Sequence, residues 1–225
     1  MPGCSSSNRL HGYHGRSLSV DLSPASASWD ALDERTLRGF LGGSGLGTFL
    51  LLKEDIASVD PLGADAAVIF SFSPLVGSPL TTSAKFAIVC KSPLTNRISD
   101  SLVSSYFALA GKRAGCDAIV IRGRASQPSV LLIDNGAVKV ESCSDLWGKT
   151  CSVAEAELRR RYGPDYQAAV IGPAGEQLVR YATISHAGRH AGRGGSGAVL
   201  GSKNLKAVLV RGTHRCTWAD PAALN

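Results

Sequence analysis

The chain has 225 residues, of which 44% are hydrophobic and 19% charged, so it can bury the core of one globular domain. No apolar run approaches the roughly 18 residues of a membrane span, and the amino terminus lacks the apolar stretch of a secretory signal. The net charge of +6 permits an anionic partner. Six cysteines, scattered without a C-x-x-C pair, indicate reduced thiols in a cytoplasmic protein.

The amino-terminal half predicts helices set among strands. Residues 1–14 are rich in polar side chains, and we expect them to be flexible. Apolar spacing predicts helices over 31–40 and 45–53, and a shorter helix over 106–114 that ends at Gly115. Strands are predicted at residues 15–22, 66–72, 85–90 and 117–123.

The carboxy-terminal half predicts a hairpin, a helix and further strands. Asp134-Asn135-Gly136 is a hairpin turn signal between two apolar segments. Ser152 and Glu155 predict a capping box that opens a helix, and Gly163 ends that helix. Strands are predicted at residues 168–172, 179–185 and 206–210. Because neighbouring strands and hairpins dominate this order, the predicted fold class is α+β with mixed or antiparallel sheets.

Residues 186–207, HAGRHAGRGGSGAVLGSKNLKA, form a basic strip with six glycines. Residues 177–219 contain seven Lys or Arg and no acid. The positive charge of this segment therefore exceeds the net charge of +6 of the whole chain. Glycine allows positive φ and brings N–H groups close to a ligand, while Arg and Lys, here including Lys203 and Lys206, neutralise phosphate. The strip predicts a site for a compact phosphorylated ligand. Nucleic acid is not expected, because few aromatic residues lie nearby.

Other readings of the strip have weaker support. Residues 192–197 match G-x-G-x-x-G, but Gly201 interrupts the following residues within a turn and Asp220 lies beyond the last strand. Dinucleotide binding is therefore not favoured. A flexible glycine-rich loop without a ligand is the plain alternative. His186 and His190 have a metal-ligand spacing for a helix, but the glycines around them favour surface or loop positions.

An ordered set of segments carries a resemblance over about residues 15–212. It resembles the N-terminal domain of the aldehyde ferredoxin oxidoreductase family, which are tungsten or, less often, molybdenum pterin enzymes. The segments are GSGLG, KSPLT, AGCDAIVIRGRA, LWGK, IGPAGE and R-x-x-GRGGSGAVLGSKNLKA. The resemblance implies two β-sheets with helices that form a saddle, a domain at 15–212, and a tail or the start of a following domain at 213–225. On the saddle, two pyranopterins hold the metal and Mg²⁺ bridges their phosphates.

The resemblance also implies the positions that meet the cofactor. One phosphate and the Mg²⁺ fall at Arg189, His190 and the following glycine turn. The other half of the cofactor is expected to meet residues 102–105 and Lys85. Leu-Val-Ser-Ser stands at 102–105 where the family has an Asn-Ser-Gly-Gly run, and Lys85 stands where the family has an arginine. Carbonyls of Leu102 and His190 would meet the Mg²⁺. The cofactor-binding candidates are Lys85, Leu102, Ser104, Arg189, His190, Gly192, Arg193, Gly194 and Gly195.

Serine in place of glycine hinders close backbone approach, and lysine lacks the bidentate fork of arginine.

In the family, the cysteines that hold the [4Fe–4S] cluster lie in later helical domains, so we expect no iron–sulfur cluster in this chain. The implied function is oxidation of an aldehyde or oxo group, with electrons passed to an iron–sulfur acceptor on a separate chain. We expect the chain to be inactive without that second polypeptide, and to pair either with it or with a second copy of itself. The alternative is a non-enzymatic pterin-binding or degenerate scaffold protein.

Overall fold

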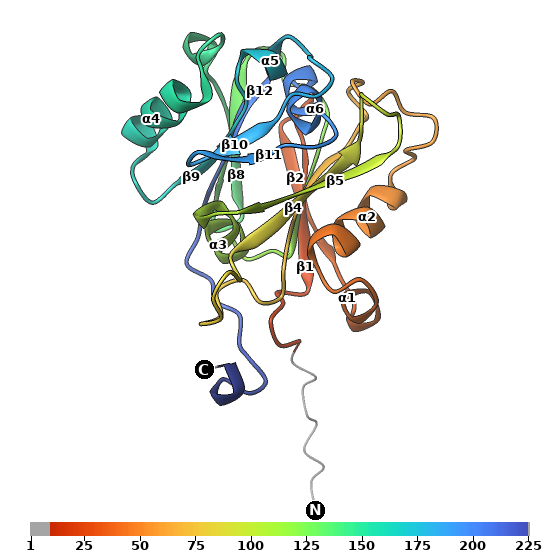
Figure 1. The fold of residues 1–225 in the computed structure, drawn as a ribbon, viewed down its shortest axis with the longest axis vertical. Helices are drawn as coiled ribbons and strands as arrows, with labels where there is room; N and C mark the ends of the chain where they lie inside the picture. Colours follow the sequence, from red (N-terminus) through yellow and green to blue (C-terminus); the bar gives the residue numbers. More distant parts are fainter. Residues whose placement is uncertain (1–9, 225) are drawn as a thin grey trace, which may run out of the picture.

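The computed structural model describes residues 10–224, which form two six-stranded mixed sheets with six α-helices (Figure 1). The predicted α+β class is confirmed. The strands are β1 (Arg16–Asp21), β2 (Ser26–Ala31), β3 (Val68–Phe72), β4 (Lys85–Lys91), β5 (Ile98–Ser104), β6 (Ala118–Arg122), β7 (Ser129–Asp134), β8 (Ala137–Ser142), β9 (Gln167–Val170), β10 (Ile184–His186), β11 (Arg189–Ala191) and β12 (Leu205–Arg211). The helices are α1 (Glu34–Phe40), α2 (Gly43–Lys53), α3 (Tyr106–Arg113), α4 (Cys151–Tyr162), α5 (Pro173–Glu176) and α6 (Ser196–Ser202).

The strand order of the first sheet is β2-β1-β6-β3-β4-β5, and that of the second is β11-β10-β9-β12-β7-β8. Each sheet contains one parallel pair, β1 with β6 and β7 with β12, and its other pairs are antiparallel. The edge strand β5 of the first sheet lies beside the edge strand β11 of the second (Figure 1). The two sheets therefore meet along one side of the molecule.

Apolar side chains fill three layers. The central core lies between the sheets, where Phe86 and Phe107 pack with ring centroids 4.9 Å apart. Helix α2 covers the outer face of the first sheet, and α4 covers that of the second (Figure 1). Helices α3 and α6 contact strands of both sheets. Both sheets thus bury their two faces, which explains why their inner strands read as continuous apolar runs.

Several local predictions are confirmed. Asn135 and Gly136 have φ of 50° and 85°, as a type I′ hairpin turn between β7 and β8 requires. The helix at α3 ends before Gly115, and Gly163 follows α4 with a φ of 92°. Of the segment expected to be flexible, residues 1–9 lie outside the described residues. Its remainder is in contact with the domain, since the His14 N–H donates to an Asp117 carboxylate oxygen at 3.1 Å.

Four element predictions need correction. The helix expected over 31–40 begins at Glu34, because β2 runs to Ala31 and pairs with β1. The capping box at Ser152 is wrong, since Thr150 precedes α4 and no side chain caps it. The strand expected over 179–185 is confined to β10. The residues after the glycine turn form the helix α6, where a turn was predicted. The strand before α6 is β11, a short antiparallel hairpin strand. A dinucleotide-binding βαβ unit has a parallel strand at this place, so dinucleotide binding is still not favoured.

Two buried ion pairs tie distant segments together. Lys206 pairs with Glu176 and also donates to the Lys149 carbonyl at 2.7 Å, while Glu176 accepts the Gly148 N–H at 2.7 Å. The LWGK, IGPAGE and GSKNLKA segments therefore meet at one internal contact. In the second pair, Lys112 Nζ lies 2.5 Å from an Asp117 oxygen, and the same carboxylate accepts the N–H groups of residues 14 and 15.

Candidate functional site

A two-residue turn sets the position of Arg189. Ala187 and Gly188 have φ of 47° and 74° and close the β10–β11 hairpin. The Glu155 carboxylate, on α4, accepts the Ala187 N–H at 2.9 Å and so holds the turn in place. Arg189 follows as the first residue of β11, exposed, and within residues 10–224 its guanidinium has no hydrogen-bonded partner. Its charge is available to an anion.

The two histidines of the strip lie on this hairpin and not on a helix. His190 is exposed, with its Nδ1 atom 2.7 Å from Ser185 Oγ. His186 is buried, its Nδ1 atom lies 2.8 Å from the Ala168 carbonyl, and its ring packs against Phe107. The prediction of a surface position is wrong for His186, because β10 is an inner strand of its sheet.

The glycine turn after β11 is packed tightly against its own protein. Gly194 and Gly195 have φ of 71° and 76°, and a Cβ on them would lie 1.8 Å from Ser99 Oγ and 1.9 Å from the Arg180 carbonyl oxygen. These glycines thus have a packing role that the sequence did not predict. Gly192 differs, since a Cβ there would meet open space.

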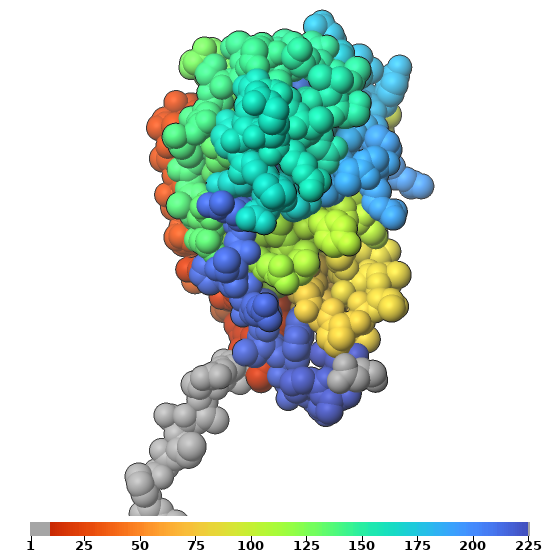
Figure 2. All heavy atoms as spheres, turned by 90° about the vertical axis from the view of Figure 1, so that its left-hand side faces the viewer, coloured from red at the N-terminus to blue at the C-terminus, as the bar shows by residue number. Residues whose placement is uncertain are grey.

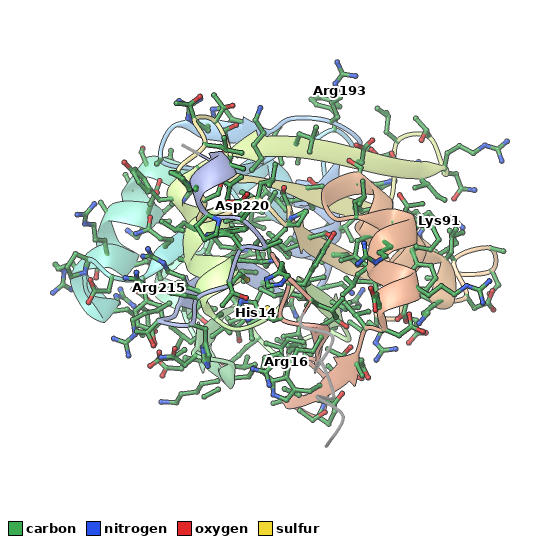
Figure 3. The ribbon with its side chains drawn as sticks, turned by 90° about the horizontal axis from the view of Figure 1, so that it is seen from below. His14, Arg16, Lys91, Arg193, Arg215 and Asp220 are labelled. Carbon is green, nitrogen blue, oxygen red and sulfur yellow. The ribbon has the colours of Figure 1, made fainter. Side chains whose placement is uncertain are left out.

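Arg193 connects this turn to β5. Its N–H donates to Ser101 Oγ at 3.2 Å, while its side chain stands out from the surface (Figure 3). No acidic partner of the guanidinium is found among the described residues. Arg193 therefore adds a second unpaired cation to the side on which the sheets meet.

Strand β5 presents its alternate residues to solvent. Leu102 is 60% exposed, whereas its neighbours Ser101 and Val103 are buried. Ser104 pairs with Lys85 across the β4–β5 ladder, and Lys85 is exposed with no side-chain partner in residues 10–224. Lys85, Leu102 and Ser104 are thus close in space, although 19 positions separate the first from the last.

Two adjoining hollows lie on this face. The first has a volume of about 580 Å³, and the exposed side chains of Leu41, Leu75, Leu80 and Leu102 line it, with Lys85 as the charged residue of its lining. It is therefore largely apolar.

The second hollow has a volume of about 460 Å³, and its largely apolar lining includes several hydroxyl groups and one arginine. Thr82, Ser83, Ser104, Ser105 and Arg189 contribute to it, and residues 80, 82 and 83 border both hollows. The structure therefore brings Lys85, Leu102, Ser104 and Arg189 to one face. The glycine turn lies farther along β5, against Ser99 and Ser101.

Ser105 is a further candidate residue, although the sequence analysis considered it only as a serine that hinders close approach of the backbone to the cofactor. It precedes α3, its Oγ atom is buried without a hydrogen-bond partner, and it does not cap the helix. The amino-terminal end of α3 carries the positive end of the helix dipole and has unsatisfied N–H groups. This end opens into the same hollow as Arg189, so the hollow favours an anion. The hydroxyl-rich run at 81–83, of which Thr82 and Ser83 also line the hollow, was the missed signal in the sequence.

Lys203 and Lys206 do not belong to this site, and their predicted role in neutralising phosphate is wrong. Both are fully buried, because α6 and β12 carry them into the interior. Lys203 donates to the carbonyls of Ala64 at 3.0 Å and Gly123 at 3.2 Å. Its burial lowers the pKa of the ammonium group to about 8. The basic strip therefore divides into surface arginines and internal lysines.

The cysteines of residues 10–224 are free thiols, and Cys90, Cys116 and Cys143 are buried. Burial raises the pKa of each of these three thiols to about 12, which keeps them protonated. Over the same residues, His, Cys, Asp and Glu side chains do not gather in threes as metal ligands. None of the described helices has the length and apolarity to cross a lipid bilayer.

Comparison with known proteins defines the class. The model of the aldehyde ferredoxin oxidoreductase N-terminal domain matches residues 17–212, and the chain therefore belongs to the aldehyde ferredoxin oxidoreductase family. The chain is 41% identical over 213 residues to the tungsten-containing aldehyde ferredoxin oxidoreductase of Pyrococcus furiosus, a match that covers 94% of this chain and 35% of that protein. The predicted resemblance is confirmed.

Two further relatives widen the comparison. The chain is 38% identical over 221 residues to the WOR-like subunit of the aliphatic sulfonate oxidoreductase of Pyrococcus furiosus, covering 91% of this chain and 35% of that subunit. It is also similar to a chain of the active site complex BamBC of benzoyl coenzyme A reductase with 1,5-dienoyl-CoA. That similarity has a TM-score of 0.88 at 34% identity and covers 92% of this chain and 32% of the other. The chain spans about a third of the length of these relatives.

Proposed function

We propose that residues 15–212 bind a tungsten or molybdenum bis-pyranopterin in an oxidoreductase that acts on an aldehyde or another oxo group. The observation that supports this most is the face where β5 meets β11, which carries three cations without an acidic partner among residues 10–224, beside two adjoining hollows. These cations are Lys85, Arg189 and Arg193. Family membership makes a pterin phosphate the natural anion for them.

Polar groups in the lining of the second hollow support a phosphate there. Arg189 supplies a planar fork for charge-assisted hydrogen bonds, the free Ser105 hydroxyl needs a partner, and the start of α3 favours negative charge. Arg193 and Gly192 extend the same face, and the carbonyls of His190 and Leu102 are the proposed Mg²⁺ ligands. The metal and its pterins, when bound, supply the electron-transfer chemistry that no side chain of this face provides.

The apolar hollow fits the other half of the cofactor less well. Lys85 is its charged group, and Leu102 offers an apolar side chain, so the second pterin is held by main-chain groups and apolar contact. The leucines of this hollow exclude water from the cofactor once it is covered. We propose that a second polypeptide supplies that cover and the iron–sulfur acceptor, and the assembly of the similar chain into the active site complex BamBC supports a partner.

Loss of pterin from a variant tests the proposal. The chain is co-expressed with the proposed second polypeptide in a host supplied with tungstate, and pterin and tungsten per protein are measured by fluorescence and elemental analysis. We expect Arg189→Ala to lose most of the pterin, because a hydrogen bond to a charged group contributes about 1.5–3 kcal/mol. Arg35→Ala, an exposed residue on α1, is the control and retains it.

Unchanged pterin content in the double variant Arg189→Ala, Arg193→Ala would contradict the proposed placement. Turnover is measured separately with an aldehyde and a viologen acceptor. Retained pterin without turnover in any combination of chains would instead favour the non-enzymatic pterin-binding protein.

A further inference from the structure

A second basic hollow lies at the end of the molecule where the tail passes α3. Figure 2 shows the tail, in blue, running beside the yellow-green residues of α3. The hollow has a volume of about 200 Å³. Its lining includes Lys112, Arg113, Arg215 and His214, with Leu109 and Trp218 as apolar members, and it contains no acid.

Nearby carboxylates do not neutralise this hollow. Asp117 is paired with Lys112 inside the protein and accepts two main-chain N–H groups as well. The Asp220 carboxylate accepts the N–H groups of the two residues at 222 and 223, at 3.0 and 3.1 Å. Arg113 and Arg215 have no acidic partner in residues 10–224, so two guanidinium charges face the hollow uncompensated.

Hydrogen bonds hold the walls of the hollow in place. The Arg113 carbonyl accepts the His214 N–H at 3.0 Å and lies 3.2 Å from His214 Nδ1. Cys216 Sγ lies 3.4 Å from His14 Nε2. Burial and then the charge of Lys112 lower the pKa of His14, which favours its neutral form beside the thiol. A preorganised wall costs little to order when a ligand binds.

We propose that this hollow binds a phosphate group, either as the free ion or at the end of a small organic molecule. The forks of Arg113 and Arg215 match phosphate oxygens. Leu109 and Trp218 form an apolar wall against which an organic portion packs. The site is separate from the proposed pterin face, since Arg193 lies on a different side of the molecule from Arg215 (Figure 3).

Titration of the chain with inorganic phosphate and with phenyl phosphate, followed by calorimetry and by the NMR signals of His214, tests this site. We expect saturable binding with shifts at His214. Arg113→Ala and Arg215→Ala should each weaken it at least about tenfold, which corresponds to about 1.4 kcal/mol. The control Arg35→Ala removes the same charge from α1 and should change the affinity less than twofold.

The comparison of the two probes identifies the source of the phosphate. Tighter binding of phenyl phosphate supports an organic phosphate that uses Trp218, and equal affinity supports the free ion. Arg113→Lys and Arg215→Lys preserve the charge but not the fork, so they should weaken binding severalfold and decide the question if an alanine variant does not fold. Binding that does not saturate, or that the Arg113 and Arg215 variants leave unchanged, overturns the proposal.

Discussion

The ion pair between Glu176 and Lys206 gives a sharp test of what its three sequence segments do. The exposed fractions of the two side chains are 1% and 0%. We expect Glu176→Ala to lower the free energy of unfolding by about 3–5 kcal/mol, because it leaves a buried ammonium without its counter-ion. It also leaves the Gly148 N–H without the acceptor that it meets at 2.7 Å. A loss of this size is a large part of the 5–15 kcal/mol that stabilises a typical domain.

Urea unfolding followed by circular dichroism measures this loss. Arg38→Ala removes half of an exposed pair on α1 and is the matched control, for which we expect a change below about 1 kcal/mol. The double variant Glu176→Leu, Lys206→Met removes both charges and should lose less than the sum of the single variants. If Glu176→Ala cost no more than Arg38→Ala, the reasoning that the pair anchors the three segments would be refuted.

Two further predictions follow from Lys203 and the glycine turn. Because burial lowers the pKa of Lys203 from 10.5 to about 8, the folded chain binds this proton less tightly than the unfolded chain. Relative to Lys203→Met, the wild type should therefore gain unfolding free energy as pH rises from 8 to 10.5, measured by urea unfolding at each pH. Gly195→Ala should destabilise the protein by more than about 2 kcal/mol in thermal melts, since its Cβ would lie 1.9 Å from a carbonyl oxygen at positive φ. Gly192→Ala should change stability by less than about 0.5 kcal/mol, and equal losses for both would contradict the packing described for the turn.

The sequence predicts the inner strands well because they carry their own signal. β3, β4 and β6 are continuous apolar runs that are buried on both faces, and the hairpin turn at Asn135 has the residues that positive φ favours. The edge strand β2 lacks that signal. β2, with the sequence SASWDA, is exposed throughout and exists because its backbone pairs with β1.

Helix α6 escaped prediction for a related reason. Its glycines suggest a turn, yet Gly197 and Gly201 approach the carbonyl oxygens of Thr183 and Gly175 so closely that no side chain fits. Helix formation there depends on neighbours that local sequence does not reveal.

The candidate site was predicted in part. Motif order placed Lys85, Leu102, Ser104 and Arg189, and the structure brings these residues to one face. The order of motifs alone does not distinguish residues that face a ligand from residues that stabilise the fold. Lys206 and Arg189 look alike in the basic strip, but one is internal and the other exposed, because burial depends on which side of β12 or β11 each residue occupies. The sequence predicts the start of α3 after Ser105, but it does not reveal that the Ser105 hydroxyl is buried without a hydrogen-bond partner.

The leucines that line the apolar hollow affect how copies of this chain behave in solution. With a net charge of +6, the copies repel one another when little salt is present. Salt shortens the range of that repulsion to about 10 Å at 0.1 M, whereas it leaves the attraction between exposed leucines intact. The uncovered domain is therefore expected to remain dispersed in dilute buffer and to self-associate through this hollow as ionic strength rises, the reverse of the behaviour of a protein held together by surface ion pairs.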